Sequence, residues 1–319
     1  MLTFILFIIG FVLLIKGADL LVSGATSLAY NYSIPPIVVG LTIVAFGTSM
    51  PEFVVNMVAS FNGNTDLSIG NILGSNIGNV FLILGLSAAI YPLTAKGNTI
   101  FKEIPFSLLA AFTVFILAND VMFKNGPTNI ITLGDGLLLL SFFAIFMYYI
   151  FGIAKEEKQD SNKEQEEVTI NSNLKNAGLI LGGLLLLIVG GKWIVDGAIV
   201  IATYLGMTEK VIGLTVVAIG TSLPELATSV VAAMKKQSDI AIGNIIGSNI
   251  FNIFWILGAS ALVAPLTFDS SANVDIFMVM LASIILFATM YVGKKHVIER
   301  WQGVLMILIY IGYLYYLLG

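Results

Sequence analysis

The chain has 319 residues, of which 58% are hydrophobic and 11% charged, and its mean hydropathy is +0.97. Soluble domains carry about 25% charged residues, so the composition excludes an ordinary soluble protein and predicts an all-α integral membrane protein. The absence of cysteine excludes disulfides and thiolate metal sites. The net charge of −4 gives no reason to expect a nucleic-acid partner.

Apolar runs of membrane-spanning length follow one another along the chain and predict ten transmembrane helices. One strongly charged segment, residues 155–176, separates the fifth run from the sixth. We expect a solvated linker there, between an N-terminal half at 1–154 and a C-terminal half at 177–319. The ten expected spans are 2–30, 36–61, 68–92, 103–121, 132–154, 177–206, 209–234, 241–266, 273–293 and 302–318.

One phrase occurs twice, as GLTIVAFGTSMPE ending at Glu52 and as GLTVVAIGTSLPE ending at Glu225. The offset of 225 − 52 = 173 residues continues without insertion through GNILGSNIGN and GNIIGSNIFN. These phrases define two repeats, at about 36–92 and 209–266. Five spans per half is an odd number, so the second half enters the membrane from the opposite side. The sequence therefore predicts inverted repeats, with broken helices meeting near the membrane midplane.

Positive charges indicate the orientation, because lysine and arginine gather on the cytoplasmic side of membrane proteins. With an external N-terminus, eleven of them fall in cytoplasmic segments, and only Lys124 and Lys210 fall in external ones. We therefore expect a multi-pass protein of the plasma membrane with both termini outside. The eleven residues are Lys96, Lys102, Lys155, Lys158, Lys163, Lys175, Lys235, Lys236, Lys294, Lys295 and Arg300.

The motif GTSMPE predicts a break in a helix. Pro51 has no amide hydrogen, so the carbonyl near Gly47 loses its donor and the helix kinks. Such backbone is tolerated at membrane depth only inside protein or beside a watery cavity. Glu52 adds a carboxylate, and an ionisable residue within a span is functional by default. The second copy repeats this arrangement at Gly220, Thr221, Ser222, Pro224 and Glu225.

The second motif supplies neutral oxygen atoms. Asn71, Ser75 and Asn79 are spaced by four residues and therefore share one helix face. Calcium prefers hard oxygen ligands of this kind, and sodium, an ion of similar size, accepts the same ligands. Magnesium needs a tighter octahedron and transition metals prefer nitrogen or sulfur, so neither is expected. The equivalent residues of the second copy are Asn244, Ser248 and Asn252.

Two carboxylates in one closed site offer a hypothesis for ion exchange. Charges about 5 Å apart repel by roughly 3 kcal/mol at an effective dielectric constant of 20, and their desolvation adds to this cost. Closure of the site without a cation is then unfavourable. One divalent cation or several monovalent cations would relieve the repulsion and would compete for the same oxygens. Such competition produces antiport rather than leak.

Other charged residues have structural interpretations. Lys16 and Asp19 are three residues apart, so we expect them to pair along one helix. Asp66 and Asp239 recur at the repeat offset, where a loop meets a helix. We expect them to cap those helices, with an entry funnel for ions as the second interpretation.

The paired motifs GTSMPE/GTSLPE and GSNIGN/GSNIFN resemble the two α-repeats of the sodium/calcium exchangers, within the cation/calcium exchanger superfamily. The resemblance covers essentially the whole chain. It implies a carrier that exchanges several sodium ions for one calcium ion, with net movement of charge. It also implies that the transported Ca²⁺ and Na⁺ are the ligands and that no cofactor is needed.

The resemblance also assigns roles to individual positions of this sequence. Two carboxylates are shared by calcium and sodium, two backbone carbonyls complete the calcium site, and serines with further carbonyls form flanking sodium sites. Two asparagines line the middle. These implied residues are Glu52 and Glu225 (carboxylates), Thr48 and Thr221 (calcium carbonyls), Ser49 with Ser75 and Ser222 with Ser248 (sodium), Ala45 and Ala218 (sodium carbonyls), and Asn79 and Asn252 (middle).

One position departs from part of the family. Some relatives, including potassium-dependent exchangers, carry aspartate where this chain has Asn252. The asparagine leaves two carboxylates in the site, and we therefore expect transport that does not require potassium.

Other functions remain as alternatives. A proton/calcium antiporter, or a broader cation/proton antiporter, is the first of these, because Glu52 and Glu225 can also carry protons. A cation channel is less expected, since two broken helices suit an occluding carrier better than a ring-shaped filter. An enzyme is not expected, because the chain offers no nucleophile–base pair. Nothing in the sequence indicates a protein partner, and we expect the lipid bilayer to surround a monomer.

Overall fold

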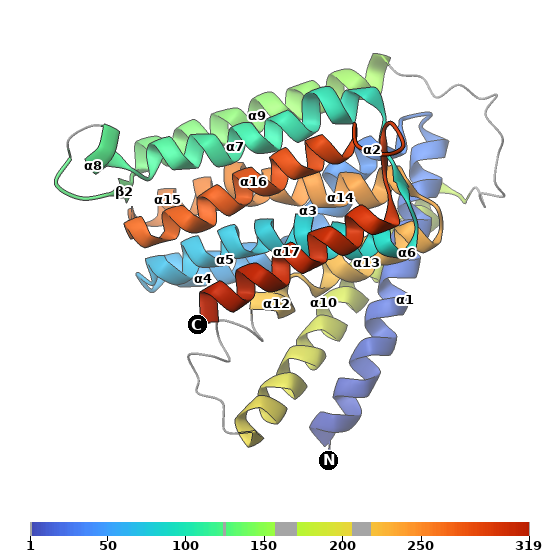
Figure 1. Cartoon of the computed structure of the whole chain (residues 1–319). Helices are drawn as coiled ribbons and strands as arrows, with labels where there is room; N and C mark the ends of the chain where they lie inside the picture. The colour runs from blue at the N-terminus through green and yellow to red at the C-terminus, as the bar shows by residue number, and fades with distance from the viewer. Residues whose placement is uncertain (1, 124–125, 157–170, 206–217, 319) are drawn as a thin grey trace.

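A computed structural model describes residues 2–123, 126–156, 171–205 and 218–318, and helices make up nearly all of them (Figure 1). Helices are the expected solution for apolar runs in lipid, because each backbone group must find its partner within the segment. The strands in these ranges are two residues long and only join loops. The long single helices are α1 (Leu2–Asn31), α9 (Leu133–Glu156), α10 (Asn173–Tyr204), α16 (Asn273–Thr289) and α17 (Arg300–Leu318).

Several spans are built from consecutive segments, and some of these segments are turns of π-helix. Turns of π-helix are rare in proteins, but those that occur are often found at functional sites. The first broken span contains α2 (Pro36–Val39), η1 (Gly40–Val44), α3 (Ala45–Thr48) and α4 (Met50–Phe61). The others contain α5 (Thr65–Gly78), η2 (Asn79–Leu84) and α6 (Gly85–Ile90); η3 (Thr99–Glu103) and α7 (Ile104–Leu117); α12 (Ala218–Thr221) and α13 (Leu223–Met234); and α14 (Ser238–Ile250), η5 (Phe251–Leu257) and α15 (Gly258–Val263). The short helices α8 (Asp120–Phe123) and η6 (Ser270–Ala272) lie in loops.

The helices confirm a multi-pass membrane protein. In the described part of the chain, seven helices are long and apolar enough to cross a membrane, and Pro36–Thr48 with Met50–Phe61 forms an eighth, bent span. Each of the ten predicted spans contains helix. The seventh is seen only from residue 218, because 206–217 lie outside the described ranges. The linker predicted at 155–176 likewise falls mostly outside them, and the number of ten crossings stays a prediction.

Four short strands join the loops in two antiparallel pairs. Strand β1 (Leu93–Thr94) pairs with β4 (Val297–Ile298), and β2 (Ile130–Ile131) pairs with β3 (Leu266–Thr267). In the predicted topology the first pair joins two cytoplasmic loops and the second joins two external loops. Each pair therefore unites loops that are expected on the same side of the membrane.

Helices α1 and α10 lie side by side and project below the other helices in Figure 1. Glycines at equivalent positions of the two halves, related by the offset of 173 residues, allow this close approach. A Cβ atom added to Gly10 would lie 2.9 Å from the carbonyl oxygen of Gly190, and one added to Gly17 would lie 2.8 Å from that of Gly183. Any larger side chain at these positions would push the two helices apart.

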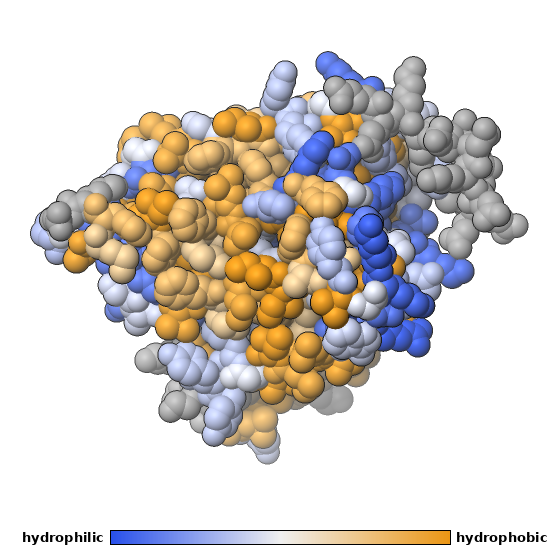
Figure 2. All heavy atoms as spheres, turned by 45° about the horizontal axis from the view of Figure 1, so that its top comes forward, coloured by the Kyte–Doolittle hydropathy of each residue, from blue (hydrophilic) through white to orange (hydrophobic). Residues whose placement is uncertain are grey.

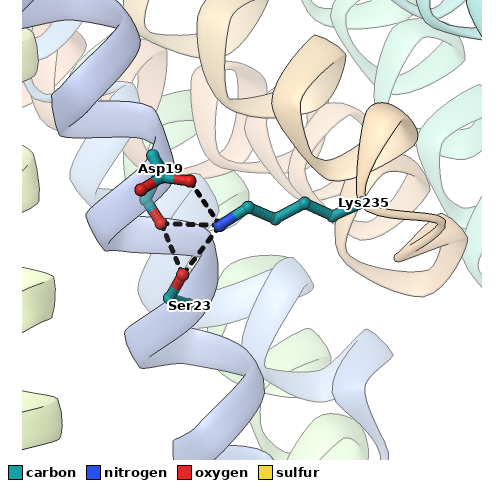
Figure 3. Close-up of polar contacts among 3 residues, drawn as sticks. All are labelled: Asp19, Ser23 and Lys235. Atoms are coloured by element: carbon teal, nitrogen blue, oxygen red, sulfur yellow. Dashed lines mark hydrogen bonds and ion pairs between the residues drawn. The ribbon is translucent and has the colours of Figure 1, made fainter. Parts of the chain in front are cut away.

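The predicted pairing of Lys16 with Asp19 is wrong. The Asp19 carboxylate forms an ion pair of 2.6 Å with Lys235, at the C-terminal end of α13. The same ammonium group donates to the backbone carbonyl of Asp19 at 3.1 Å and to Ser23 Oγ at 2.7 Å (Figure 3). A contact between helices far apart in sequence has replaced one within a helix, because α1 packs against α13 here.

The capping roles predicted for Asp66 and Asp239 are also wrong. Both lie in the first turn of their helices, α5 and α14. Asn64 is the residue that caps α5, where its side chain accepts a hydrogen bond from the amide of Leu67 at 3.2 Å. Asp239 instead forms an ion pair of 2.6 Å with Lys96, which joins the start of α14 to the loop after α6.

The surface and the interior match a protein in lipid. Figure 2 shows apolar side chains over most of one face, with hydrophilic residues gathered mainly toward its right-hand edge. The most enclosed span is Ser238–Val263, of which 94% is buried inside the protein. Thr65–Ile90, the equivalent span of the first repeat, is 78% buried. The two copies of the second motif therefore lie at the centre of the fold.

Candidate functional site

The first repeat breaks its helix at Ser49, as the motif predicts. Ser49 has φ −82° and ψ 7°, and the two halves of the span are bent by 47°. Backbone bonds cross the break from Ser49 N to Ala45 O at 3.0 Å and from Phe53 N to Ser49 O at 3.1 Å. Helix α3 ends at Thr48 and α4 begins at Met50, so Ser49 alone separates the two helices. The break therefore lies one turn before Glu52.

The second repeat breaks in the same way at Ser222, with φ −86° and ψ 6°. The amide of Leu226 donates to the carbonyl of Ser222 at 3.0 Å, which matches the bond from Phe53 to Ser49. Each break places a glutamate in the first turn of the following helix, Glu52 in α4 and Glu225 in α13. The two carboxylates therefore occupy equivalent positions in the two repeats.

The two repeats exchange hydrogen bonds at these carboxylates. Ser49 Oγ donates to Glu225 Oε1 at 2.8 Å, and Ser222 Oγ donates to Glu52 Oε1 at 3.1 Å. Each serine belongs to one repeat and each carboxylate to the other. Both glutamates are only 1% exposed. One enclosed centre therefore contains both carboxylates, although they are 173 residues apart in the sequence.

The serines of the second motif reach the same centre. Ser248 Oγ donates to Glu225 Oε1 at 3.4 Å, so Ser248 and Ser49 meet at one carboxylate oxygen. Ser75 Oγ lies 3.3 Å from Ser222 Oγ, within hydrogen-bond distance. The hydroxyl groups of the two repeats are thus interleaved around the carboxylates.

Asn71 and Asn244 have a different role from the other polar residues of the second motif. Their amides donate to the backbone carbonyls of Glu52 and Glu225, at 3.5 and 3.4 Å. Asn244 Oδ1 also accepts a hydrogen bond from Thr48 Oγ1 at 2.9 Å. These two asparagines therefore hold the backbone that carries the carboxylates. The Thr48 hydroxyl also donates weakly to the carbonyl of Ala45, at 3.3 Å.

Asn79 and Asn252 lie one helical turn beyond Ser75 and Ser248, in the π-helical segments η2 and η5. Asn79 Nδ2 donates to Asn249 Oδ1, and Asn252 Nδ2 donates to Asn76 Oδ1, both at 2.9 Å. Asn76 and Asn249 were not predicted to be site residues. Their recurrence at the same offset, directly after the motif serine, was the signal that could have identified them.

Four buried oxygen atoms of this centre accept no hydrogen bond from any described residue. They are Oε2 of Glu52, Oε2 of Glu225, Oδ1 of Asn79 and Oδ1 of Asn252. A buried polar atom without a partner costs free energy, and these four atoms occupy equivalent positions in the two repeats. Hard oxygens of this kind are what calcium takes as ligands. The described residues contain no cluster of three histidine, cysteine, aspartate or glutamate side chains, so neutral oxygens must supplement the two carboxylates.

Glycine brings the helices of this centre together. A Cβ atom added to Gly247 would lie 2.8 Å from the carbonyl oxygen of Leu41 and 2.7 Å from Ala45 Cβ. Helix α14 therefore approaches η1 and α3 closely at Gly247. At Gly74, its counterpart, no described atom lies within 4 Å of the added Cβ. Ala218, whose carbonyl the resemblance implicates, is the first residue of α12.

Comparison with known proteins identifies the family. A sequence profile of the sodium/calcium exchanger protein family matches residues 2–152 and 175–319. The putative antiporter CaxA of Alkalimonas amylolytica is 37% identical over 299 residues, which cover 92% of this chain and 91% of CaxA. The sodium/calcium exchanger MaX1 of Methanosarcina acetivorans is 31% identical over 343 residues, which cover 98% of this chain and 97% of MaX1.

The fold leads to the same family. A solved structure of the sodium-calcium exchanger NCX_Mj, soaked with zero Na⁺ and Ca²⁺, matches with a TM-score of 0.83 at 34% identity. The match covers 99% of this chain and 99% of that one. The residues of this chain that the profile leaves unmatched, 153–174, overlap most of the linker predicted at 155–176. The chain belongs to the sodium/calcium exchanger family.

Proposed function

We propose that this protein is a secondary active antiporter that exchanges sodium for calcium across the membrane by alternating access. The observation that carries the proposal is the set of four unpartnered buried oxygens, two from carboxylates and two from amides. The names of two similar proteins, MaX1 and NCX_Mj, describe sodium/calcium exchangers and support it. A family of exchangers also agrees with the expectation that the chain is not an enzyme.

The charge of the site explains how one set of oxygens serves two ions. Two buried carboxylates carry two negative charges, which one Ca²⁺ or two Na⁺ neutralise. Leaving both charges uncompensated in a closed site is unfavourable, so closure and reorientation require bound cations. Ca²⁺ and Na⁺ need the same oxygens and therefore bind alternately. Exchange of more than two sodium ions for one calcium ion moves net charge, and we propose that transport is electrogenic.

We assign the ligands by their positions around the carboxylates. Glu52 and Glu225 would hold calcium with the carbonyls of Thr48 and Thr221. The remaining proposed ligands serve sodium or line the middle of the site: Ser49, Ser75, Ser222, Ser248, Ala45, Ala218, Asn79 and Asn252. The serine bonds to Oε1 leave each Oε2 available, which supports a cation at the centre.

We further propose that the two halves form inverted repeats of five spans, at 1–154 and 177–319, in the plasma membrane with both termini outside. The reciprocal bonds between Ser49 and Glu225 and between Ser222 and Glu52 support a two-fold relation between the halves. The two strand pairs, which unite loops expected on the same side, support the topology.

Proton/calcium exchange is the main competitor, but the geometry favours it less. A metal ion needs oxygens without donors, which is what the site presents. Asn252 also leaves the site with two carboxylates, which favours transport that does not require potassium.

Calcium uptake into sealed proteoliposomes tests the proposal, with outward sodium, proton and potassium gradients imposed one at a time. We expect the sodium gradient alone to drive uptake. A membrane potential that is negative outside the vesicle, the side to which sodium moves, should accelerate it. Uptake driven only by the proton gradient would replace the proposal with its main competitor. Calcium entry without any countergradient would indicate a channel.

A further inference from the structure

Asn76 and Asn249 form a reciprocal pair at the contact between the two repeats. Asn76 Nδ2 donates to the backbone carbonyl of Asn249 at 3.1 Å, and Asn249 Nδ2 donates to that of Asn76 at 3.2 Å. A carbonyl oxygen can only accept. Each side-chain amide must therefore turn its nitrogen toward the partner backbone and its oxygen Oδ1 away from it.

This constraint passes to the next pair of asparagines. Asn249 Oδ1 accepts from Asn79 Nδ2, and Asn76 Oδ1 accepts from Asn252 Nδ2, both at 2.9 Å. The side-chain nitrogens of Asn79 and Asn252 are thereby engaged as donors, and the Oδ1 atom of each of these residues faces away from the bond. Those two Oδ1 atoms are the amide oxygens without a donor among the described residues. All four side chains are at most 1% exposed, so bulk solvent does not set their orientation.

We propose that Asn76 and Asn249 are positioning residues that fix which face of the Asn79 and Asn252 amides is presented to the transported cation. The inference rests on the proposed function. The terminal torsion of asparagine is broad and nearly two-fold, so an unconstrained amide can present either oxygen or nitrogen. The nitrogen carries hydrogens and would repel a cation. The reciprocal pair removes that choice in both repeats at once.

A simpler role for the pair is adhesion between helices, and the chain offers a matched control for it. Asn119 and Asn273 also form a reciprocal amide pair between the two halves, with both hydrogen bonds at 2.8 Å. This second pair joins the end of α7 to the start of α16, outside the carboxylate centre. Adhesion predicts that loss of either pair lowers stability alike, whereas positioning predicts that only one pair governs ion affinity.

A double-mutant cycle separates the two roles. The measurement is equilibrium binding of radioactive calcium to the purified full-length protein, with thermal stability recorded for each variant. We expect Asn249→Ala to weaken calcium binding roughly tenfold and Asn119→Ala to leave it unchanged. In an Asn79→Ala background, where the oriented oxygen is already absent, Asn249→Ala should have little further effect on calcium affinity.

The outcomes are distinct. An equal loss of affinity from Asn249→Ala with and without Asn79 would overturn positioning and leave adhesion. Wild-type affinity in Asn249→Ala would also overturn it, while calcium binding by the wild type would keep the proposed function intact. A wild type that binds no calcium would overturn both. Asn76→Ala, tested through Asn252 in the same way, provides the cycle if Asn249→Ala does not fold.

Discussion

The hydroxyl of Ser49 donates a 2.8 Å hydrogen bond to a carboxylate oxygen of Glu225, a residue 176 positions further along the chain. Its counterpart joins Ser222 to Glu52 at 3.1 Å. These bonds engage one oxygen of each carboxylate and leave the other without a donor among the described residues. The serines therefore orient the carboxylates while each carboxylate keeps an oxygen for a cation.

Replacing either serine should weaken ion binding in a matched way. A hydrogen bond to a charged group contributes about 1.5–3 kcal/mol, so Ser49→Ala and Ser222→Ala should each weaken calcium binding roughly tenfold or more. Initial rates of calcium uptake against calcium concentration would show this as a raised KM. Ser141→Ala, at an exposed helix position, is the control and should not change KM. A normal KM in both site variants would contradict the assigned role.

Removing one charge at the centre should abolish exchange. Glu52→Gln and Glu225→Gln keep the size of each side chain but leave one negative charge, which cannot balance a divalent cation. We expect sodium-driven calcium flux to fall to the background of protein-free vesicles in both variants. Sodium-driven calcium exchange at the wild-type rate in either variant would refute a site that needs two carboxylates.

Adding a carboxylate should change the coupling. Asn252→Asp introduces a third negative charge and removes the side-chain amide that donates a hydrogen bond to Asn76 Oδ1. Repulsion between the carboxylates then needs a further cation for relief. We expect calcium uptake by this variant to depend on potassium or on pH where the wild type does not. Coupling indistinguishable from the wild type under both conditions would show that residue 252 does not contribute to the charge of the site.

The proline break should matter for function more than for folding. Pro51→Ala restores an amide donor for the carbonyl of Gly47 and favours a straighter helix. We expect lower calcium affinity with a melting temperature that is unchanged or higher. Both quantities must be measured on the same variant, because a protein that misfolds would show a lower calcium affinity together with a lower melting temperature. Full affinity in a well-folded Pro51→Ala protein would mean that the break does not build the site.

Close packing at Gly247 should control stability. A methyl group there meets the backbone of Leu41 and the side chain of Ala45, and overpacking of this kind costs about 1–3 kcal/mol. Gly247→Ala should therefore lower the melting temperature of the purified protein. Gly152→Ala is the matched control, because nothing described lies within 4 Å of its added Cβ. Equal melting temperatures in the two variants would contradict the close approach of α14 and η1.

The main residues of the carboxylate centre could be predicted because their motifs occur twice in the sequence. Pro51 and Glu52 reappear as Pro224 and Glu225, and this repetition predicts two equivalent breaks from the sequence alone. The apolar runs likewise predicted where each helix lies. The breaks at Ser49 and Ser222 are confirmed by their backbone angles.

Contacts between the repeats could not be read from spacing. Periodicity places Asn76 on a helix but does not say which residue of the other repeat faces it. Asp19 illustrates the same limit, because a lysine three residues away suggested a local pair and the structure uses Lys235 instead. The choice depends on which helices pack together, and a single sequence does not encode that in its periodicity.

The most direct test of a shared site is equilibrium binding of radioactive calcium to the purified protein over a sodium titration. A shared site predicts that sodium displaces all bound calcium, that added calcium overcomes the displacement, and that the apparent calcium Kd rises more steeply than the sodium concentration. Calcium that stays bound at saturating sodium would place the two ions on separate sites and contradict the account.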